Sequence, residues 1–239
     1  YGEIARIVNN PTIINGRYSF QSDSELKIPN DIKEKLLLNK SDDVLDIGCG
    51  SGDIAIQISK SVNSITVCDH QNTINRLMKI NKLKNFLYIP SNFLEAEFGD
   101  SKYSKIIIYS VLQTLSTKEE LFNVLEKIKS LLKDGGRVLI GDIPNNDKLG
   151  RFLSTQRGKE FSNNWNKLKK KYKASQVEVS KFVSAENISS INFDDQLIFE
   201  ILKFYRKCNF NSYLLEQRHD LPFGNSREDI IVNHSDFYI

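Results

Sequence analysis

The stretch that decides the fold is Val44-Leu45-Asp46-Ile47-Gly48-Cys49-Gly50-Ser51-Gly52. It begins with an apolar run of strand length and ends in three glycines that alternate with other residues. Residues 53–60 follow with apolar side chains at helical spacing. A strand, a glycine-rich turn and a helix in this order form a ligand site in doubly wound sheets, because backbone N–H groups meet a cleft there.

The sequence around this stretch alternates between short apolar runs and helix-length periodic segments, which is typical of a parallel sheet built from βαβ units. The expected strands are 44–47, 64–69, 86–89, 104–109 and 137–142, and the expected helices between them are 53–60, 72–81 and 117–133. After Pro144 the alternation stops, and a polar, basic, helix-prone segment extends to about Asn192. An amphipathic helix over 194–208 and two strands, 211–217 and 228–233, complete the pattern and predict a terminal hairpin.

The ligand of the glycine-rich turn is indicated by the acidic residues around it. A dinucleotide fingerprint would need a glycine where Asp53 stands, and the Gly-Lys-Ser/Thr ending of a P-loop is absent. Asp46, two residues before the first glycine, is a poor neighbour for a pyrophosphate and a favourable one for an ammonium group. S-adenosylmethionine carries an amino acid end and a sulfonium and has no phosphate.

Several further motifs, in the same order along the chain, make this sequence resemble the class I S-adenosylmethionine-dependent methyltransferases. They are residues 44–52, Asp69 at the end of the second strand, Ser91-Asn92-Phe93 after the third, Tyr109-Ser110-Val111-Leu112-Gln113-Thr114 after the fourth, residues 131–140, and the terminal run 227–232. The resemblance covers about residues 40–143 and 195–235. It implies a doubly wound, seven-stranded, mostly parallel α/β sheet whose last strand is antiparallel, with helices on both faces.

The resemblance also implies a cofactor site for S-adenosylmethionine, with S-adenosylhomocysteine as product. Asp69 would hold both ribose hydroxyls, Asn92 and Phe93 would flank and hydrogen-bond adenine, and His70 would border it. The other expected cofactor residues are Asp46, Gly48, Gly50, Gly52 and Ser110. Many family members have Asp where Asn92 stands, but an amide can still donate and accept hydrogen bonds.

The acceptor side is expected at the carboxyl ends of strands one, four and five, where the reactive methyl lies in this fold. Candidates there by position are Tyr109, Ser110, Gln113 and Asp142. A general base is needed only when the acceptor holds its proton tightly, as an alcohol does. His219, after the sixth strand, is a further candidate base, with a surface hairpin residue as the alternative interpretation.

The charge of the insertion indicates which kind of acceptor the chain binds. Residues 145–175 carry nine basic and two acidic side chains, although the whole chain has a net charge of +3. We therefore expect a helical lid over 145–193, inserted between strand five and the following helix of a core formed by 41–144 and 194–239, with residues 1–40 as an N-terminal helical cap. The lid would present Arg151, Arg157 and Trp165 to a small anionic acceptor such as a phosphorylated metabolite, a nucleotide-linked sugar or a carboxylate. For Lys167–Lys173 a solvated helix face is the favoured interpretation.

Composition bounds these expectations. The chain has 239 residues, 40% hydrophobic and 26% charged, which suits one globular α/β domain. No apolar stretch approaches the roughly 20 residues of a membrane span. The three cysteines show no metal-ligand spacing, so we expect no metal and a reducing cytoplasm. The N-terminal Arg17 or Tyr18 is expected to close over the cofactor.

Three other functions compete with small-molecule O- or N-methylation. A nucleic-acid methyltransferase is the first, although the Asn/Asp-Pro-Pro-aromatic run of many base N-methylating enzymes is absent after strand four. A non-catalytic S-adenosylmethionine-binding subunit is the second. A dehydrogenase is the weakest, because of Asp53. The oligomeric state and the identity of the acceptor stay open.

Overall fold

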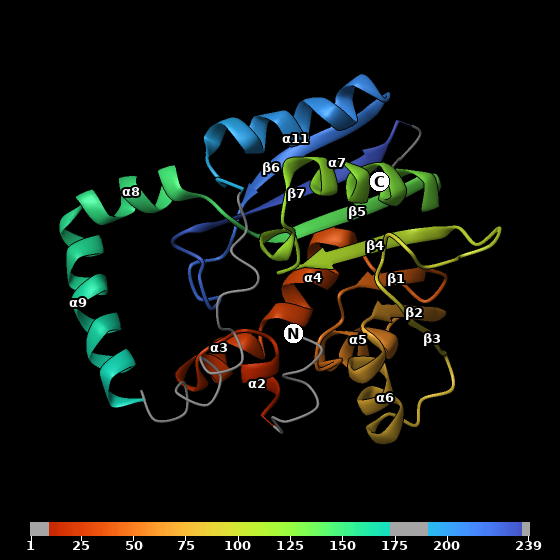
Figure 1. Ribbon diagram of the computed structural model, residues 1–239, viewed down its shortest axis with the longest axis horizontal. Coiled ribbons are helices and arrows are strands. Elements are labelled where there is room, and N and C mark those ends of the chain that lie inside the picture. The colour runs from red at the N-terminus through yellow and green to blue at the C-terminus, as the bar shows by residue number, and fades with distance from the viewer. Residues whose placement is uncertain (1–9, 173–190, 236–239) are drawn as a thin grey trace.

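Seven strands form one sheet in the computed structural model, which describes residues 10–172 and 191–235 (Figure 1). They are β1 (Asp43–Ile47), β2 (Ser64–Asp69), β3 (Phe86–Pro90), β4 (Tyr103–Tyr109), β5 (Leu132–Pro144), β6 (Phe210–Glu216) and β7 (Arg227–His234). The order is β3-β2-β1-β4-β5-β7-β6, and β7 alone runs antiparallel to its neighbours. The predicted doubly wound, mostly parallel sheet with an antiparallel last strand is confirmed.

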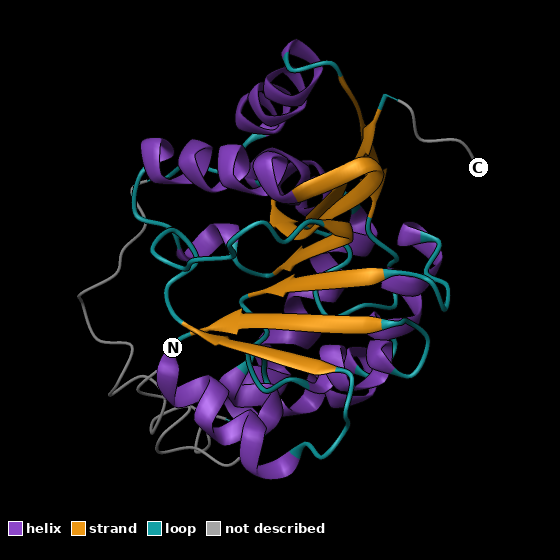
Figure 2. Cartoon of the chain, turned by 90° about the vertical axis from the view of Figure 1, so that its right-hand side faces the viewer, coloured by secondary structure: helices purple, strands orange, loops and turns teal. Residues whose placement is uncertain are grey.

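Helices cover both faces of this sheet (Figures 1 and 2). One face carries α4 (Ile28–Leu36), α5 (Asp53–Ser59) and α6 (Gln71–Ile80), and the other carries α7 (Lys118–Leu131) and α11 (Asp195–Lys207). The central strand β4 supplies both layers, because successive side chains of a strand point to opposite faces. Ile106 and Ile108 join the apolar cluster under α7 and α11, and Ile107 joins the other cluster.

The fifth strand begins earlier than expected. The sequence predicts a helix end and turn at residues 134–136, whereas β5 starts at Leu132. Leu132 pairs with Tyr103 and Arg137 with Lys105, so the residues between them form a bulge in the ladder. Gly135 in this bulge has φ +69°. The local turn expected from the glycines is therefore present, but it lies inside the strand.

Short helices precede the sheet and fill the first part of the insertion. They are α2 (Pro11–Ile14), the 3-10 turn η1 (Ser19–Gln21) and α3 (Ser22–Glu25), then α8 (Asn146–Ser154) and α9 (Gln156–Lys171). Figure 1 shows α8 and α9 standing at one side of the sheet, with the far end of α9 near α3. The Trp165 ring on α9 meets the Phe20 ring edge-on at 5.0 Å. Residues 1–9 of the expected cap and 173–190 of the expected lid lie outside the described residues.

Candidate active site

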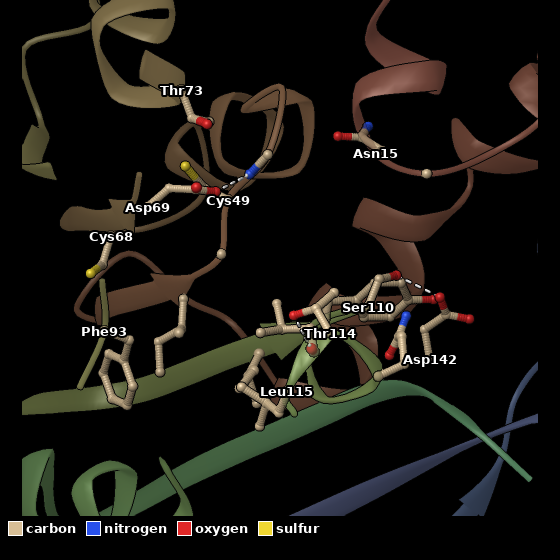
Figure 3. A pocket seen from close by; sticks show the side chains of 18 of the residues that line it. Asn15, Cys49, Cys68, Asp69, Thr73, Phe93, Ser110, Thr114, Leu115 and Asp142 are labelled. Carbon is tan, nitrogen blue, oxygen red and sulfur yellow. Dashed lines mark hydrogen bonds between the residues drawn. The ribbon is translucent and has the colours of Figure 1, made fainter. Parts of the chain in front are cut away.

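A cavity of about 560 Å³ opens at the carboxyl ends of β1, β2, β4 and β5 (Figure 3). Its size is within the roughly 300–1,000 Å³ of small-molecule sites. The glycine-rich turn forms one wall, and the residues that follow β3 and β4 form another. The N-terminal segment 14–17 and two residues of the β6–β7 region, Phe223 and Arg227, close it. The topological switch point of the sheet, between β1 and β4, lies at this cavity.

The first two glycines of the turn bring its backbone close to other segments. Gly48 and Gly50 have φ values of +70° and +54°, a region that side chains with a Cβ rarely adopt. A Cβ on Gly48 would lie 2.4 Å from Val111, and one on Gly50 would lie 2.6 Å from Asn15 Oδ1. Asn15 Oδ1 also accepts a hydrogen bond from the Ser51 amide at 3.0 Å. The turn is thus held between β4 and the N-terminal segment, at the wall of the cavity.

Gly52 has a different role from the other two glycines and does not line the cavity. It precedes α5 with φ +84°, and a Cβ there would lie 2.4 Å from Leu77 Cδ1 of α6. This glycine allows α6 to pack against the start of α5. Helix packing, rather than contact with a ligand, therefore accounts for the third glycine of the turn.

Replacing Gly52 with alanine is expected to lower the free energy of unfolding by about 1–3 kcal/mol, because alanine is strained at this φ and would also press on Leu77. Gly150 is the matched control, since it is exposed in α8 and its Cβ would meet nothing within 4 Å. Gly150→Ala should leave stability unchanged or raise it by up to roughly 1 kcal/mol. Urea denaturation of both variants measures the difference; equal stabilities would contradict the packing role of Gly52.

Asp46 belongs to β1, two residues before Gly48; it is 3% exposed and is not among the residues that line the cavity. Its Oδ2 atom is buried and has no hydrogen-bond partner among the described residues. Burial, together with the charge of Asp69, raises the pKa of Asp46 from 3.8 to about 7. A buried carboxylate oxygen without a partner is costly, and a cationic group bound in the cavity would relieve this cost.

Asp69 ends β2 and faces the turn (Figure 3). Its Oδ2 accepts a hydrogen bond from the Gly50 amide at 2.9 Å, and its Oδ1 accepts one from the His70 amide at 2.6 Å. Burial raises the pKa of Asp69, although these amide donors act in the opposite direction. The Thr73 side chain also hydrogen-bonds this carboxylate, so of its roughly four acceptor positions about one is left for a ligand. His70 lines the cavity and caps α6 by accepting from the Asn72 amide at 3.2 Å.

The residues after β3 form the opposite wall. Asn92 and Phe93 both line the cavity, and Asn92 Oδ1 accepts a hydrogen bond from the Leu94 amide at 2.9 Å. Lys127 of α7 lies over the Phe93 ring, with Nζ 5.3 Å from its centroid, and donates to the Leu94 carbonyl at 2.9 Å. These contacts hold the backbone of the loop after β3 and the Phe93 ring in place.

A compact polar cluster lies where β4 and β5 end. The Ser110 hydroxyl donates to Asp142 Oδ2 at 2.5 Å, as Figure 3 shows. Ser110 and Asp142 have φ values of +61° and +59°, and such strain at non-glycine residues gathers at functional sites. Tyr109 precedes Ser110 and packs its ring on Gly141. Burial and the charge of Asp142 raise the pKa of Tyr109, so its hydroxyl stays protonated at neutral pH.

Two side chains to which the sequence assigned no functional role complete this cluster. Gln217 is buried, and its Nε2 donates to the Tyr109 hydroxyl at 3.1 Å and to Asp142 Oδ1 at 3.3 Å. Arg227 lines the cavity with Nε 3.7 Å from Asp142 Oδ1. Both come from the terminal hairpin, and no local sequence pattern marks them. Asp229, also of β7, accepts from the Asp142 amide at 2.8 Å and holds the backbone of β5 in place.

The N-terminal segment reaches the same cluster. Arg17 is buried, its Nη2 donates to Ser110 Oγ at 2.8 Å and its Nη1 donates to Glu25 at 2.9 Å. Asn15, which contacts the turn, donates to the same Glu25 carboxylate at 2.6 Å. The segment therefore joins the glycine-rich turn to the end of β4. Tyr18 instead stacks on Phe20, outside the cavity lining.

Four of the predicted acceptor-side residues do not line the cavity. His219 is exposed at the surface beyond β6, so its imidazole is not positioned to act as a base. Arg151 is exposed and pairs with Asp195 at 2.6 Å, and Arg157 is exposed on α9. Trp165 packs among aromatic rings of which Phe223 is the one that reaches the cavity. The sequence pattern could not reveal these positions, because they depend on how the loop after β6 and the helices α8 and α9 pack on the core.

The described residues contain no group of three or more His, Cys, Asp or Glu side chains that could hold a metal ion. None of their helices is long and apolar enough to cross a membrane.

Comparison with known proteins identifies the family. A family model described as a methyltransferase domain matches residues 38–212. A curated relative, the O-methyltransferase rstn1 of Aspergillus nomiae, is 26% identical over 140 residues, which are 53% of this chain and 60% of that protein. The chain thus matches less than two thirds of the length of this relative.

Two solved structures share the fold over nearly their whole length. The N-methyltransferase NodS of Bradyrhizobium japonicum, in complex with S-adenosylhomocysteine, has a TM-score of 0.59 at 11% identity, covering 98% of this chain and 96% of its own. The plantazolicin methyltransferase BpumL, also with S-adenosylhomocysteine, has a TM-score of 0.60 at 14% identity, covering 98% and 93%. Because the family model matches most of the chain, this protein belongs to the class I S-adenosylmethionine-dependent methyltransferases.

Proposed function

We propose that this chain transfers the methyl group of S-adenosylmethionine to an oxygen atom of a small-molecule acceptor. The observation that carries the proposal is the polar cluster of Ser110 and Asp142, which shares one cavity with the glycine-rich turn and Asp69. One end of the cavity suits a cofactor with an amino acid group and a ribose. The other end offers a carboxylate to a hydroxyl group of the acceptor.

The residues at the cofactor end fit S-adenosylmethionine in charge and hydrogen bonding. Asp46 has a buried oxygen without a partner among the described residues, which suits the ammonium group. Asp69 keeps an acceptor position for a ribose hydroxyl, and Asn92 and Phe93 line the cavity beside the position proposed for adenine. Gly48 and Gly50 allow the backbone to approach the ligand, with His70 and Ser110 at its borders. The bound cofactor supplies an electrophilic methyl group on a sulfonium.

The chain's own contribution to the reaction is alignment, exclusion of water and removal of one proton. Asp142 is the proposed base because its carboxylate lines the cavity and is held by Ser110 and Gln217. A carboxylate can accept the proton of a hydroxyl as the new C–O bond forms. Tyr109 keeps its proton and is the proposed donor that orients the acceptor. The similarity to an O-methyltransferase supports oxygen as the methylated atom.

We also propose that the insertion 145–193 acts as a lid on the core formed by 41–144 and 194–239. Trp165 of α9 lies 5.9 Å from Phe223, ring centroid to centroid, and Phe223 lines the cavity. The lysines at the end of α9 are outside the cavity lining, so they do not favour a nucleic-acid acceptor. Free thiols at Cys49, Cys68 and Cys208 suit a reducing compartment such as the cytoplasm.

Titration calorimetry tests the proposal. S-adenosylhomocysteine should bind the chain with 1:1 stoichiometry, and NAD should not bind. Labelled-methyl transfer to panels of phosphorylated sugars, nucleotide sugars and small hydroxy acids would then identify the acceptor class. Binding of NAD in place of S-adenosylhomocysteine would contradict the cofactor assignment. A methylated product with the label on nitrogen would contradict the assignment of oxygen.

A further inference from the structure

We propose that Arg227 binds an anionic group of the acceptor, and that the acceptor is an aromatic carboxylate carrying the hydroxyl group that is methylated. The inference rests on the proposed function, because it names the substrate class of the same cavity. It also reassigns the anion site, which the sequence pattern placed on Arg151 and Arg157 of the insertion.

The side chain of Arg227 is half-buried, lines the cavity and is incompletely paired. Its side chain is 17% exposed, and its Nη1 atom has no hydrogen-bond partner among the described residues. The carboxylate of Asp142 lies 3.7 Å from Nε, beyond hydrogen-bond distance. The oxygens of Asp142 already accept from Ser110 and Gln217. An unpaired donor atom of a charged group is unfavourable away from water, and a ligand anion would relieve that cost.

A second guanidinium lies on the other side of Asp142. Arg17 Nη2 is 3.9 Å from Asp142 Oδ2, and the Nε of Arg17 is likewise buried with no hydrogen-bond partner in the described part of the chain. Glu25 balances the charge of Arg17, which leaves Asp142 to balance Arg227. When Asp142 takes up the hydroxyl proton it becomes neutral, and Arg227 loses its counter-charge. A carboxylate on the acceptor would keep the site balanced through that step.

The wall beside Arg227 is aromatic. The guanidinium carbon of Arg227 lies 5.0 Å from the centroid of the Phe223 ring, which itself lines the cavity. Behind Phe223 stands Trp165, which is packed edge-on against Tyr18 and Phe20 at 5.4 and 5.0 Å between centroids. A flat ring can lie along Phe223 while its carboxylate meets the planar fork of Arg227 in a bidentate pair. This combination favours an aromatic carboxylate over a phosphorylated sugar, which has no flat apolar face.

The cations of the insertion provide the contrast. Arg151 is already bonded to both oxygens of Asp195, with Nη1 at 2.6 Å and Nη2 at 3.2 Å, and its side chain is 60% exposed. An exposed and already paired arginine adds little to the binding of an anion, because water screens it. It is therefore a suitable control of the same residue type.

The test measures binding of benzoate and of its neutral isostere benzamide to protein saturated with S-adenosylhomocysteine. Calorimetry gives the affinities, and the fluorescence of Trp165, the single tryptophan of the chain, reports changes beside Phe223. Benzoate should bind at least tenfold more tightly than benzamide. Arg227→Met should abolish this preference, Arg227→Lys should restore part of it, and Arg151→Met should leave it unchanged. The affinity for S-adenosylhomocysteine should be the same in all four proteins.

Each other outcome has a defined meaning. Equal affinities for benzoate and benzamide in the unmodified protein, or no binding of either, would overturn the proposal. Loss of the preference in Arg151→Met but not in Arg227→Met would return the anion site to the insertion. A loss of S-adenosylhomocysteine affinity in Arg227→Lys would assign Arg227 to the cofactor instead. No binding of S-adenosylhomocysteine to the unmodified protein would refute the proposed function, and the assignment of Arg227 with it.

Discussion

Asp46→Asn is expected to weaken binding of S-adenosylhomocysteine by at least about 30-fold, since removing one partner of a buried charge pair costs roughly 2–5 kcal/mol. Asp46 is 3% exposed, and one of its carboxylate oxygens has no hydrogen-bond partner among the described residues. None of these residues therefore takes the place of the ligand's ammonium group as the partner of that oxygen. Calorimetry measures the loss. Asp43→Asn is the control, because Asp43 lies at the opposite end of β1 and pairs with Lys133.

The same residue predicts how binding depends on pH. Because the pKa of Asp46 is raised to about 7, the carboxyl group is mostly protonated at pH 6 and mostly ionised at pH 8. The ammonium group of the ligand favours the ionised form. Affinity should therefore rise as the pH increases from 5.5 toward 7.5, and binding at pH 6 should release close to one proton. Calorimetry in buffers of different ionisation enthalpy measures this proton release.

Folding stability without ligand should follow the opposite trend. The pKa of Asp46 is higher in the folded chain than the 3.8 of the free side chain, so ionisation favours the unfolded chain. The contribution of Asp46 to stability is present below about pH 4 and is lost as the pH rises through 7. In Asp46→Asn the pH dependence of affinity and the pH dependence of stability should both become flatter. Any slope that is left would come from the titration of Asp69. A variant that keeps the full slope of affinity against pH would show that another group titrates.

The second large effect is expected from Asp142→Asn, which should lower kcat by a factor of about 10² to 10⁴. Asparagine keeps the shape of the side chain but cannot accept the hydroxyl proton of the acceptor. The affinity for S-adenosylhomocysteine should stay unchanged, because Asp142 belongs to the acceptor end of the cavity. Labelled-methyl transfer to the hydroxy acid that the wild-type chain converts fastest gives the rate.

His219→Ala distinguishes Asp142 as the base from His219, the base suggested by sequence position. His219 is exposed and outside the cavity lining, so its removal should leave kcat within about twofold of wild type. A large loss in His219→Ala together with a small one in Asp142→Asn would exchange their roles. Equal losses in kcat and in cofactor affinity for Asp142→Asn would instead indicate a damaged cavity.

The positions of the strands along the chain and of the cofactor end could be predicted because both depend on local patterns, whereas the sheet topology was implied by the family resemblance. Strands buried on both faces, such as β4 with Ile106, Ile107 and Ile108, must be apolar throughout, and that pattern is visible in one short window. The turn after β1 needs glycines where φ is positive. An acidic residue at the end of β2 can be located by counting strands. Each of these requirements acts on residues that are close in sequence.

The acceptor end could not be predicted in the same way, because it is assembled from distant segments. Arg17 precedes the sheet, Ser110 follows β4, and Asp142 lies near the end of β5. Gln217 and Arg227 belong to the terminal hairpin. The antiparallel insertion of β7 beside β5 brings the last two to the cavity, and no local periodicity records that placement. For the same reason the basic residues of α8 and α9 suggested an anion site that their exposed positions do not support.

The sequence by itself determined that a glycine-rich turn with Asp46 before it and Asp69 at the next strand end lies in a doubly wound sheet. These features follow from backbone sterics and strand burial, which are local. Only the tertiary structure decided that Gly52 serves helix packing, that Asp46 lacks a hydrogen-bond partner within the described chain, and that Arg227 stands beside Asp142. Those facts depend on which side chains meet across the sheet, and burial then sets the charge that each of them can hold.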